Sequence, residues 1–230
     1  MLKVFCARSM HVAVTTLSQQ FAEASGTAPD IVFEPMGALQ ARLATGETAD
    51  VLVLATPAID ALAKSGALVS ASCAEVARAP IGVAIRAGAP PDIATAEAFK
   101  AALIAARTIA LSDPAVGGSA GIYLRDLFGR IGLADMIAAK TVAQKSGVAA
   151  ANAVGRGEAD LAMTFIPELL QGKGARILGP LPPPYGHATS YAAGVSANSD
   201  IPDAARAFIA ALTAPGARDV WMAAGFEVGS

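Results

Sequence analysis

Short apolar runs alternate along this chain with segments whose apolar residues recur at the spacing of a helix face. Residues 2–7 form the first run and predict a buried strand. The helical pattern that follows is carried by Met10, Ala13, Val14, Leu17 and Phe21, with Ser9 as the expected N-cap. Such an alternation predicts mostly parallel sheets with helices on both faces, an α/β fold.

The same alternation continues to the end of the chain. Further strands are predicted at residues 30–35, 50–55, 79–88, 107–113, 157–165, 175–182 and 188–197. Helices are predicted around residues 38–43, 57–66, 95–106, 124–131 and 148–154, and in the segment of Phe208, Leu212 and Trp221.

The series of strands and helices is interrupted at two points, which predicts two lobes. One point lies near Arg78–Pro80, and the other is the proline cluster Pro182–Pro184 with the residues up to His187. We therefore expect a first lobe of residues 1–79 plus 188–230 and a second lobe of residues 80–187. In this arrangement the C-terminal segment returns to complete the first lobe.

Composition and charge narrow the class of protein. The 230 residues are 54% hydrophobic and 16% charged, with a formal net charge of −2 and no basic cluster, so we expect no nucleic-acid partner. No apolar run reaches the roughly 20 residues that span a bilayer, so we expect no membrane insertion. The cysteines and histidines lack the spacing of metal ligands. We expect a monomer without a metal or cofactor.

The N-terminus begins directly with the first predicted strand and shows no charged leader, apolar core or cleavage site. Two localisations follow as alternatives. The protein is periplasmic if a signal peptide has been removed, and otherwise it is cytoplasmic.

Four segments, taken in order, give the chain a family resemblance. They read LKVFCARSM, MGALQARLATGETADVLVLATPAIDALAKSGAL, GGSAGIYLRDLFGRIG and GRGEADLAM. With them the chain resembles the type II periplasmic solute-binding proteins, in the branch of the molybdate-binding components of ABC transporters. The loop DPAVGGSAG also resembles a side branch that includes aconitate isomerases. The resemblance implies two α/β lobes joined by two crossover strands, a small anion held in the cleft between them, and an ABC permease as partner.

The loops that follow the strands are the predicted anion site, because helix N-termini gather at the carboxyl ends of parallel strands and favour negative charge. Four such loops and two tyrosines supply the candidate ligand-binding residues. These are Arg8, Ser9, Met36, Gly37, Gly117, Gly118, Ser119, Tyr123, Lys145, Ser146 and Tyr191. Several have a structural alternative, such as a helix cap for a serine, a tight turn for the glycines or packing for a tyrosine.

Two of these residues depart from the molybdate-binding pattern. Arg8 adds a cation whose planar fork fits a carboxylate. Met36 stands where the resemblance implies a hydroxyl residue, and it adds apolar surface. The sequence therefore predicts a solute-binding protein that captures an organic carboxylate rather than molybdate, for ABC-type uptake.

Two other functions stay open from the sequence. One is a cofactor-free isomerase of an unsaturated di- or tricarboxylic acid, for which His11, Glu34 and Lys145 are the candidate bases. The other is a cytoplasmic ligand sensor. The sequence contains no nucleophile-elbow, phosphate-binding or dinucleotide-binding motif. No catalytic residue is assigned on this ground.

Overall fold

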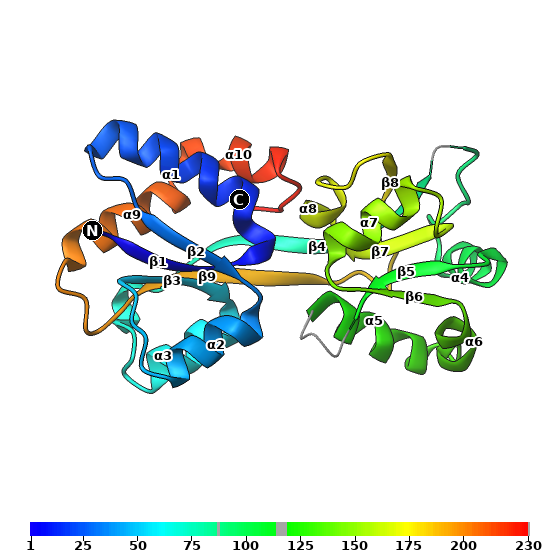
Figure 1. The fold of residues 1–230 in the computed structure, drawn as a ribbon, viewed down its shortest axis with the longest axis horizontal. Coiled ribbons are helices and arrows are strands. Elements are labelled where there is room, and N and C mark those ends of the chain that lie inside the picture. The colour runs from blue at the N-terminus through cyan, green and yellow to red at the C-terminus, as the bar shows by residue number, and fades with distance from the viewer. Residues whose placement is uncertain (87, 114–118, 230) are drawn as a thin grey trace. The chain divides into compact units, whose positions relative to one another are not determined.

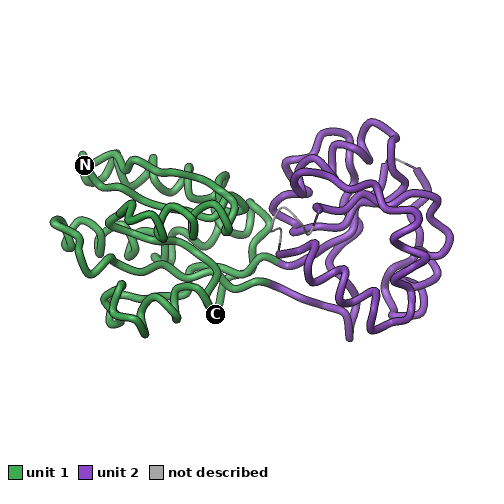
Figure 2. Tube along the Cα trace, turned by 60° about the horizontal axis from the view of Figure 1, so that its bottom comes forward, with its two compact units in different colours: residues 1–79, 189–230 green, residues 80–188 purple. Residues whose placement is uncertain are grey.

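The computed structural model describes residues 1–86, 88–113 and 119–229 of the chain. The chain divides into two compact units, residues 1–79 with 189–230 (unit 1) and residues 80–188 (unit 2) (Figure 2). It passes from one unit to the other twice, within strand β4 (Ala74–Arg86) and at the start of strand β9 (Ala188–Val195). The α/β fold predicted from the sequence is confirmed.

Unit 1 is built on a sheet with the strand order β2-β1-β3-β9-β4. Its other strands are β1 (Lys3–Ala7), β2 (Asp30–Glu34) and β3 (Val51–Ala55). β1 pairs in parallel with both β2 and β3, whereas β9 runs antiparallel to β3. The carboxyl ends of β1, β2 and β3 therefore lie at one edge of the sheet, and Tyr191 of β9 reaches the same edge opposite Ala55.

Helices cover both faces of this sheet (Figure 1). One face carries α1 (His11–Ser25), α9 (Pro202–Thr213) and α10 (Arg218–Ala223), and the other carries α2 (Met36–Ala44) and α3 (Thr56–Lys64). The apolar residues predicted to line the first helix, Met10, Ala13, Val14, Leu17 and Phe21, are all buried. The Phe21 ring packs edge-on against Phe208 of α9, so these residues join two helices on one face of the sheet.

Unit 2 has the strand order β4-β7-β5-β6, with β8 paired to β4. Its strands besides β4 are β5 (Ile109–Ser112), β6 (Thr141–Gln144), β7 (Leu161–Phe165) and β8 (Ala175–Pro180). Its helices are α4 (Ala96–Ala105), α5 (Ser119–Arg130), α6 (Ala134–Ala139), α7 (Gly147–Gly155) and α8 (Ile166–Leu169). β5 is parallel to both β6 and β7, so the carboxyl ends of these three strands share an edge.

The structure corrects the Ser9 cap and the start of one strand, and it adds two short elements that the sequence did not predict. Ser9 does not cap the first helix, because residues 8–10 form a short 3-10 turn and α1 begins at His11 after Met10. The periodicity of the apolar residues did not predict α6 or β6. The strand predicted to begin at residue 79 is β4, which begins five residues earlier, at Ala74. β6 is half-exposed along most of its length, so it lacks the apolar alternation by which strands are recognised.

No helix among the described residues is both long and apolar enough to cross a bilayer.

Helix α5 packs closely on β5 through a glycine. A Cβ atom added at Gly121 would overlap the carbonyl oxygen of Ser112. We expect Gly121→Ala to lower the free energy of unfolding by about 1–3 kcal/mol, the usual cost of overpacking. Gly129 lies on the same helix with nothing within 4 Å of an added Cβ, and Gly129→Ala should raise stability by up to about 1 kcal/mol through helix propensity. Urea unfolding of both variants measures their free energies of unfolding. Equal changes in the two variants would contradict the close packing of Gly121 on β5.

Candidate functional site

In unit 1 the first candidate residues follow β1 directly. Arg8 and Ser9 lie in the 3-10 turn Arg8–Met10, where the backbone turns from β1 into α1. The Ser9 hydroxyl is 2.8 Å from the Tyr191 hydroxyl, so the two form a hydrogen bond. Tyr191 is only 2% exposed, and its ring meets Phe226 edge-on. The structure thus brings together two residues that lie far apart in the sequence and that were predicted separately.

Arg8 differs from its neighbours because its side chain is exposed. It forms no ion pair with any residue that the structure describes. An exposed guanidinium provides both positive charge and hydrogen-bond donors for a carboxylate.

Met36 and Gly37 form the first turn of α2, after β2. Gly37 is exposed, and nothing lies within 4 Å of a Cβ built on it. Met36 is half-buried and packs against the core cluster that contains Phe5, Leu39 and Ile59. The Met36 side chain therefore contributes to the core of unit 1.

Thr56 is a residue of this edge that sequence reasoning missed. It begins α3 directly after β3, and its neighbour Ala55 pairs with Tyr191. Its hydroxyl oxygen is buried and has no hydrogen-bond partner among the described residues. The available signal was the polar residue between an apolar strand and Pro57, a position that opens a helix at the carboxyl end of a strand.

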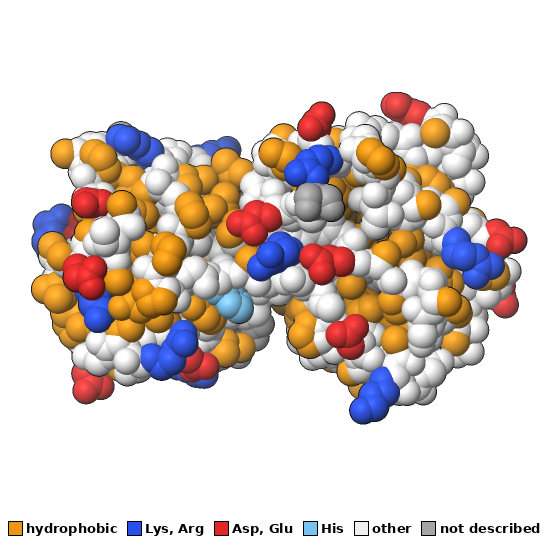
Figure 3. All heavy atoms as spheres, turned by 180° about the vertical axis from the view of Figure 1, so that it is seen from behind, with side chains coloured by type: hydrophobic (Ala, Val, Ile, Leu, Met, Phe, Trp, Pro, Cys, Tyr) orange, Lys and Arg blue, Asp and Glu red, His pale blue; other side chains and the backbone are white. Residues whose placement is uncertain are grey.

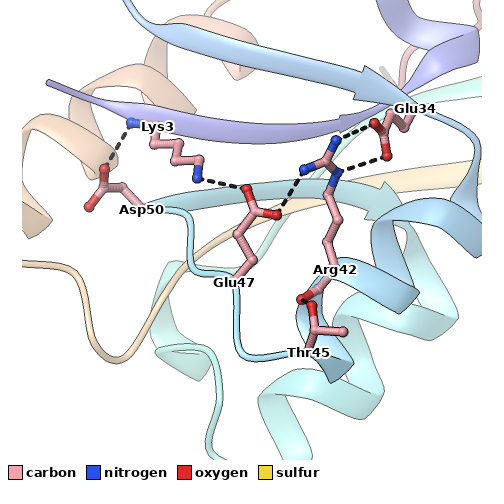
Figure 4. A network of polar contacts seen from close by, with 6 residues as sticks. All are labelled: Lys3, Glu34, Arg42, Thr45, Glu47 and Asp50. Atoms are coloured by element: carbon pink, nitrogen blue, oxygen red, sulfur yellow. Dashed lines mark hydrogen bonds and ion pairs between the residues drawn. The ribbon is translucent and has the colours of Figure 1, made fainter.

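Glu34, a candidate base, is held in an ion pair. Arg42 Nη2 lies 2.6 Å from Glu34 Oε1, and Arg42 Nε lies 2.9 Å from Glu34 Oε2, a forked pair between α2 and the end of β2 (Figure 4). The hydrogen bonds from Arg42 hold the pKa of the Glu34 carboxyl below its usual range, and the positive charge of Arg8 acts in the same direction. Glu34 is therefore ionised at neutral pH and is a weak base.

His11 and Lys145 are the other two candidate bases. His11 is exposed at the start of α1, with its ring edge-on to Phe33 and the ring centroids 4.7 Å apart. Lys145 is exposed between β6 and α7. Neither forms an ion pair with a described residue.

In unit 2 the carboxyl edge of the sheet carries the loops after β5, β6 and β7. Ser119 is exposed and is the first residue of α5. Gly117 and Gly118, which were predicted to bind the ligand beside it, lie outside the described residues.

The start of α7 already faces a carboxylate of the chain itself. A Cβ added at Gly147, the first residue of α7, would overlap Glu168 Oε2 and Thr164 Oγ1. The Thr164 side chain is fully buried, and its hydroxyl donates a hydrogen bond to Glu168 Oε2. Glu168 thus places negative charge where a helix N-terminus favours it, at a loop where the sequence predicted ligand binding.

Ser146 has a structural role at the same loop. Its hydroxyl accepts a hydrogen bond of 3.2 Å from the Ala149 N–H and caps α7. Such a cap satisfies one of the N–H groups that a helix start leaves unpaired.

Tyr123 is engaged within unit 2. Its hydroxyl donates a hydrogen bond of 2.9 Å to the Tyr185 carbonyl oxygen, and its ring stacks on His187 with the centroids 4.0 Å apart. The guanidinium of Arg130 lies 5.6 Å from the centre of the same ring. These contacts correspond to the packing alternative that the sequence left open for Tyr123.

Neither positive nor negative side chains predominate on the face of the molecule drawn in Figure 3. Basic and acidic side chains lie interspersed on the face shown in Figure 3, with no extended basic area. Among the residues that the structure describes, no group of three or more His, Cys, Asp or Glu side chains could hold a metal ion.

Comparison with known proteins gives one family and one relative of substantial identity. Residues 2–227 match the family described as bacterial extracellular solute-binding protein. An aconitate isomerase from Pseudomonas sp is 34% identical over 206 residues, which is 85% of this chain and 76% of that protein.

Solved structures agree on the fold. The periplasmic molybdate-binding protein of Azotobacter vinelandii superposes with a TM-score of 0.80 at 22% identity, with complete coverage of both chains. The sulfate-binding protein SubI of Mycobacterium tuberculosis has a TM-score of 0.73 at 18% identity and covers 98% of this chain and 85% of its own. At these identities the similarity is one of fold.

Proposed function

Because the chain belongs to the family of bacterial extracellular solute-binding proteins, we propose that it binds a small organic acid with two or three carboxylates. The observation that carries this proposal is the exposed Arg8 at the carboxyl end of β1, in the same short turn as Ser9, whose hydroxyl is hydrogen-bonded to Tyr191. A guanidinium can hold a carboxylate through two parallel hydrogen bonds, which a flexible or neutral donor cannot reproduce.

The proposed ligand contacts comprise one set of residues in each unit. In unit 1 they are Arg8, Ser9, Gly37 and Tyr191, with Met36 beside them. In unit 2 they are Gly117 and Gly118, Ser119 as the first residue of α5, and Tyr123, Lys145 and Ser146. The Glu168 carboxylate lies at the start of α7, so we assign the main anion contacts of unit 2 to the start of α5.

The relatives differ in what they contribute to this proposal. Aconitate, named in the 34% identical relative, is a tricarboxylate, which agrees with a ligand that has several carboxylates. The molybdate- and sulfate-binding proteins resemble this chain in fold at 22% and 18% identity, and they carry no argument for its ligand. We propose that the protein acts in the periplasm and delivers its ligand to an ABC-type permease.

Isomerisation of an unsaturated tricarboxylic acid is the second candidate function, and the 34% identity to an aconitate isomerase favours it. In that reaction a base removes a proton from a carbon next to a carboxylate, the double bond shifts by one position, and a proton returns to the far carbon. Cations and N–H donors around the carboxylates would stabilise the enolate-like intermediate. Glu34 suits the base role poorly because the hydrogen bonds from Arg42 occupy both of its oxygens and lower its pKa, so it accepts a proton weakly. His11 and Lys145 remain as candidate bases to test.

A thermal-shift panel tests the ligand class. A ligand at a hundred times its dissociation constant stabilises the native state by about 2.7 kcal/mol, which for a chain of this size raises Tm by roughly 5–10 °C. We expect shifts of this order with trans-aconitate, citrate and propane-1,2,3-tricarboxylate, and smaller shifts with molybdate, tungstate or sulfate at equal concentration. A larger shift with molybdate than with every carboxylate would refute the proposed ligand class.

Turnover separates the two candidate functions. A trace amount of protein is incubated with cis-aconitate, and the isomer composition is followed by chromatography. Conversion of many equivalents per chain would establish the isomerase, whereas binding without conversion would leave the solute-binding function.

A further inference from the structure

A charged network in unit 1 extends from the start of β1 to the edge that carries Arg8 (Figure 4). Lys3 Nζ lies 2.9 Å from Glu47 Oε1, and Glu47 Oε2 lies 2.8 Å from Arg42 Nη1. Arg42 therefore bridges two carboxylates, Glu47 on one side and Glu34 on the other. The four side chains carry two positive and two negative charges, so the network is neutral as a whole.

Arg8 lies next to this network but outside its ion pairs. Glu34 is in register with Ala7 across the parallel strands β1 and β2, which places Glu34 beside the residue that precedes Arg8. Glu34 is thus a carboxylate on which the positive charge of Arg8 acts, and both of its oxygens already accept hydrogen bonds from Arg42.

We propose that Arg42 is a positioning residue that holds Glu34 in the forked ion pair and thereby keeps Arg8 available for a ligand carboxylate. This inference rests on the proposed function, in which Arg8 binds the ligand. Glu34 in turn limits the affinity, because its remaining negative charge attracts the Arg8 guanidinium and so competes with the ligand carboxylate for it.

The expected change in ligand affinity depends on how exposed the Arg42–Glu34 ion pair is. The side chains of Arg42 and Glu34 are 38% and 24% exposed, so water and salt screen their interaction in part. We therefore expect changes in affinity of about two- to five-fold, the range of a partly exposed charge pair.

The test is a double-mutant cycle read by isothermal titration with propane-1,2,3-tricarboxylate at low ionic strength. This probe has three carboxylates and no double bond, so binding is measured without isomerisation. Arg42→Gln releases Glu34 to pair with Arg8 and should weaken binding about two- to five-fold, whereas Glu34→Gln should tighten it by a similar factor. The double variant, Glu34→Gln with Arg42→Gln, should return to within about two-fold of the wild-type affinity because the competing charge is gone.

Two controls separate this mechanism from a loss of structure. Arg107→Gln removes an ion pair of 3.0 Å with Asp160 in unit 2 and should leave the affinity unchanged. In an Arg8→Ala background, Glu34→Gln should no longer tighten binding, because Glu34 and Arg42 affect the ligand only through Arg8.

The outcomes distinguish this inference from the proposed function. If the double variant binds as weakly as Arg42→Gln, or if Glu34→Gln weakens binding, the inference is wrong even though Arg8 still binds the ligand. If Arg8→Ala itself binds as the wild type does, the proposed role of Arg8 fails and this inference fails with it.

Discussion

Replacing Arg8 with alanine is expected to weaken the binding of propane-1,2,3-tricarboxylate about ten-fold or more. Hydrogen bonds to a charged group contribute about 1.5–3 kcal/mol, and about 1.4 kcal/mol corresponds to a factor of ten in affinity. Arg8→Lys keeps the charge but loses the planar fork, so it should fall between the wild type and the alanine variant. Isothermal titration calorimetry of the wild type, Arg8→Ala and Arg8→Lys measures the three dissociation constants.

Stability and a matched arginine provide the controls for the Arg8 series. Arg8 is exposed and forms no ion pair with a described residue, so the Tm of the ligand-free variants should equal that of the wild type. Arg206 is another exposed arginine of unit 1, paired on α9 with Asp203, and Arg206→Ala should leave the affinity unchanged. Equal affinities of Arg8→Ala and Arg206→Ala would show that Arg8 does not bind the ligand.

An aspartate at position 119 is expected to abolish most of the ligand affinity. Ser119 is exposed at the start of α5, where the proposal places a carboxylate of the ligand. Two like charges 4 Å apart repel by about 4 kcal/mol at an effective dielectric constant of 20, and partial screening still leaves a loss of about ten-fold or more. Ser119→Asn matches the shape without the charge, and Ser119→Ala leaves the backbone donors in place, so both should bind much more tightly than Ser119→Asp.

The aspartate variant also separates binding from folding. A carboxylate in the first turn of a helix is favourable, so the ligand-free Tm of Ser119→Asp should match or exceed that of the wild type. Loss of binding together with a lower Tm would point to a damaged fold, and wild-type binding by Ser119→Asp would place the ligand away from α5.

The periodicity of the apolar residues predicted those helices and strands that bury one face along their whole length. The residues that line α1, which are Ala13, Val14, Leu17 and Phe21, are buried as expected, because a long helix repeats its apolar face several times. β6 and α6 escaped prediction because they are short, with four and six residues, and largely half-exposed or exposed. Such segments contain too few repeats for a period to be recognised.

The candidate site was predictable where it depends on strand ends and unpredictable where it depends on distant partners. The position of Arg8 and Ser9 after an apolar strand marks the carboxyl edge of a parallel sheet. The hydrogen bond from Ser9 to Tyr191 joins residues 182 positions apart, and the approach of Glu168 to Gly147 depends on the pairing of β7 and β6 with β5. The Glu34–Arg42 pair, which weakens Glu34 as a base, joins residues only eight positions apart, but it depends on how α2 turns back onto the end of β2.

We propose above all that this protein binds an organic polycarboxylate and not a bare oxyanion. Titration of the wild-type protein with propane-1,2,3-tricarboxylate and, separately, with molybdate tests it most directly. We predict saturable binding of the tricarboxylate at one molecule per chain and at least ten-fold weaker binding of molybdate, the factor that loss of one charge-assisted contact of about 1.4 kcal/mol produces. Tight binding of molybdate with no detectable heat from the tricarboxylate would contradict the claim.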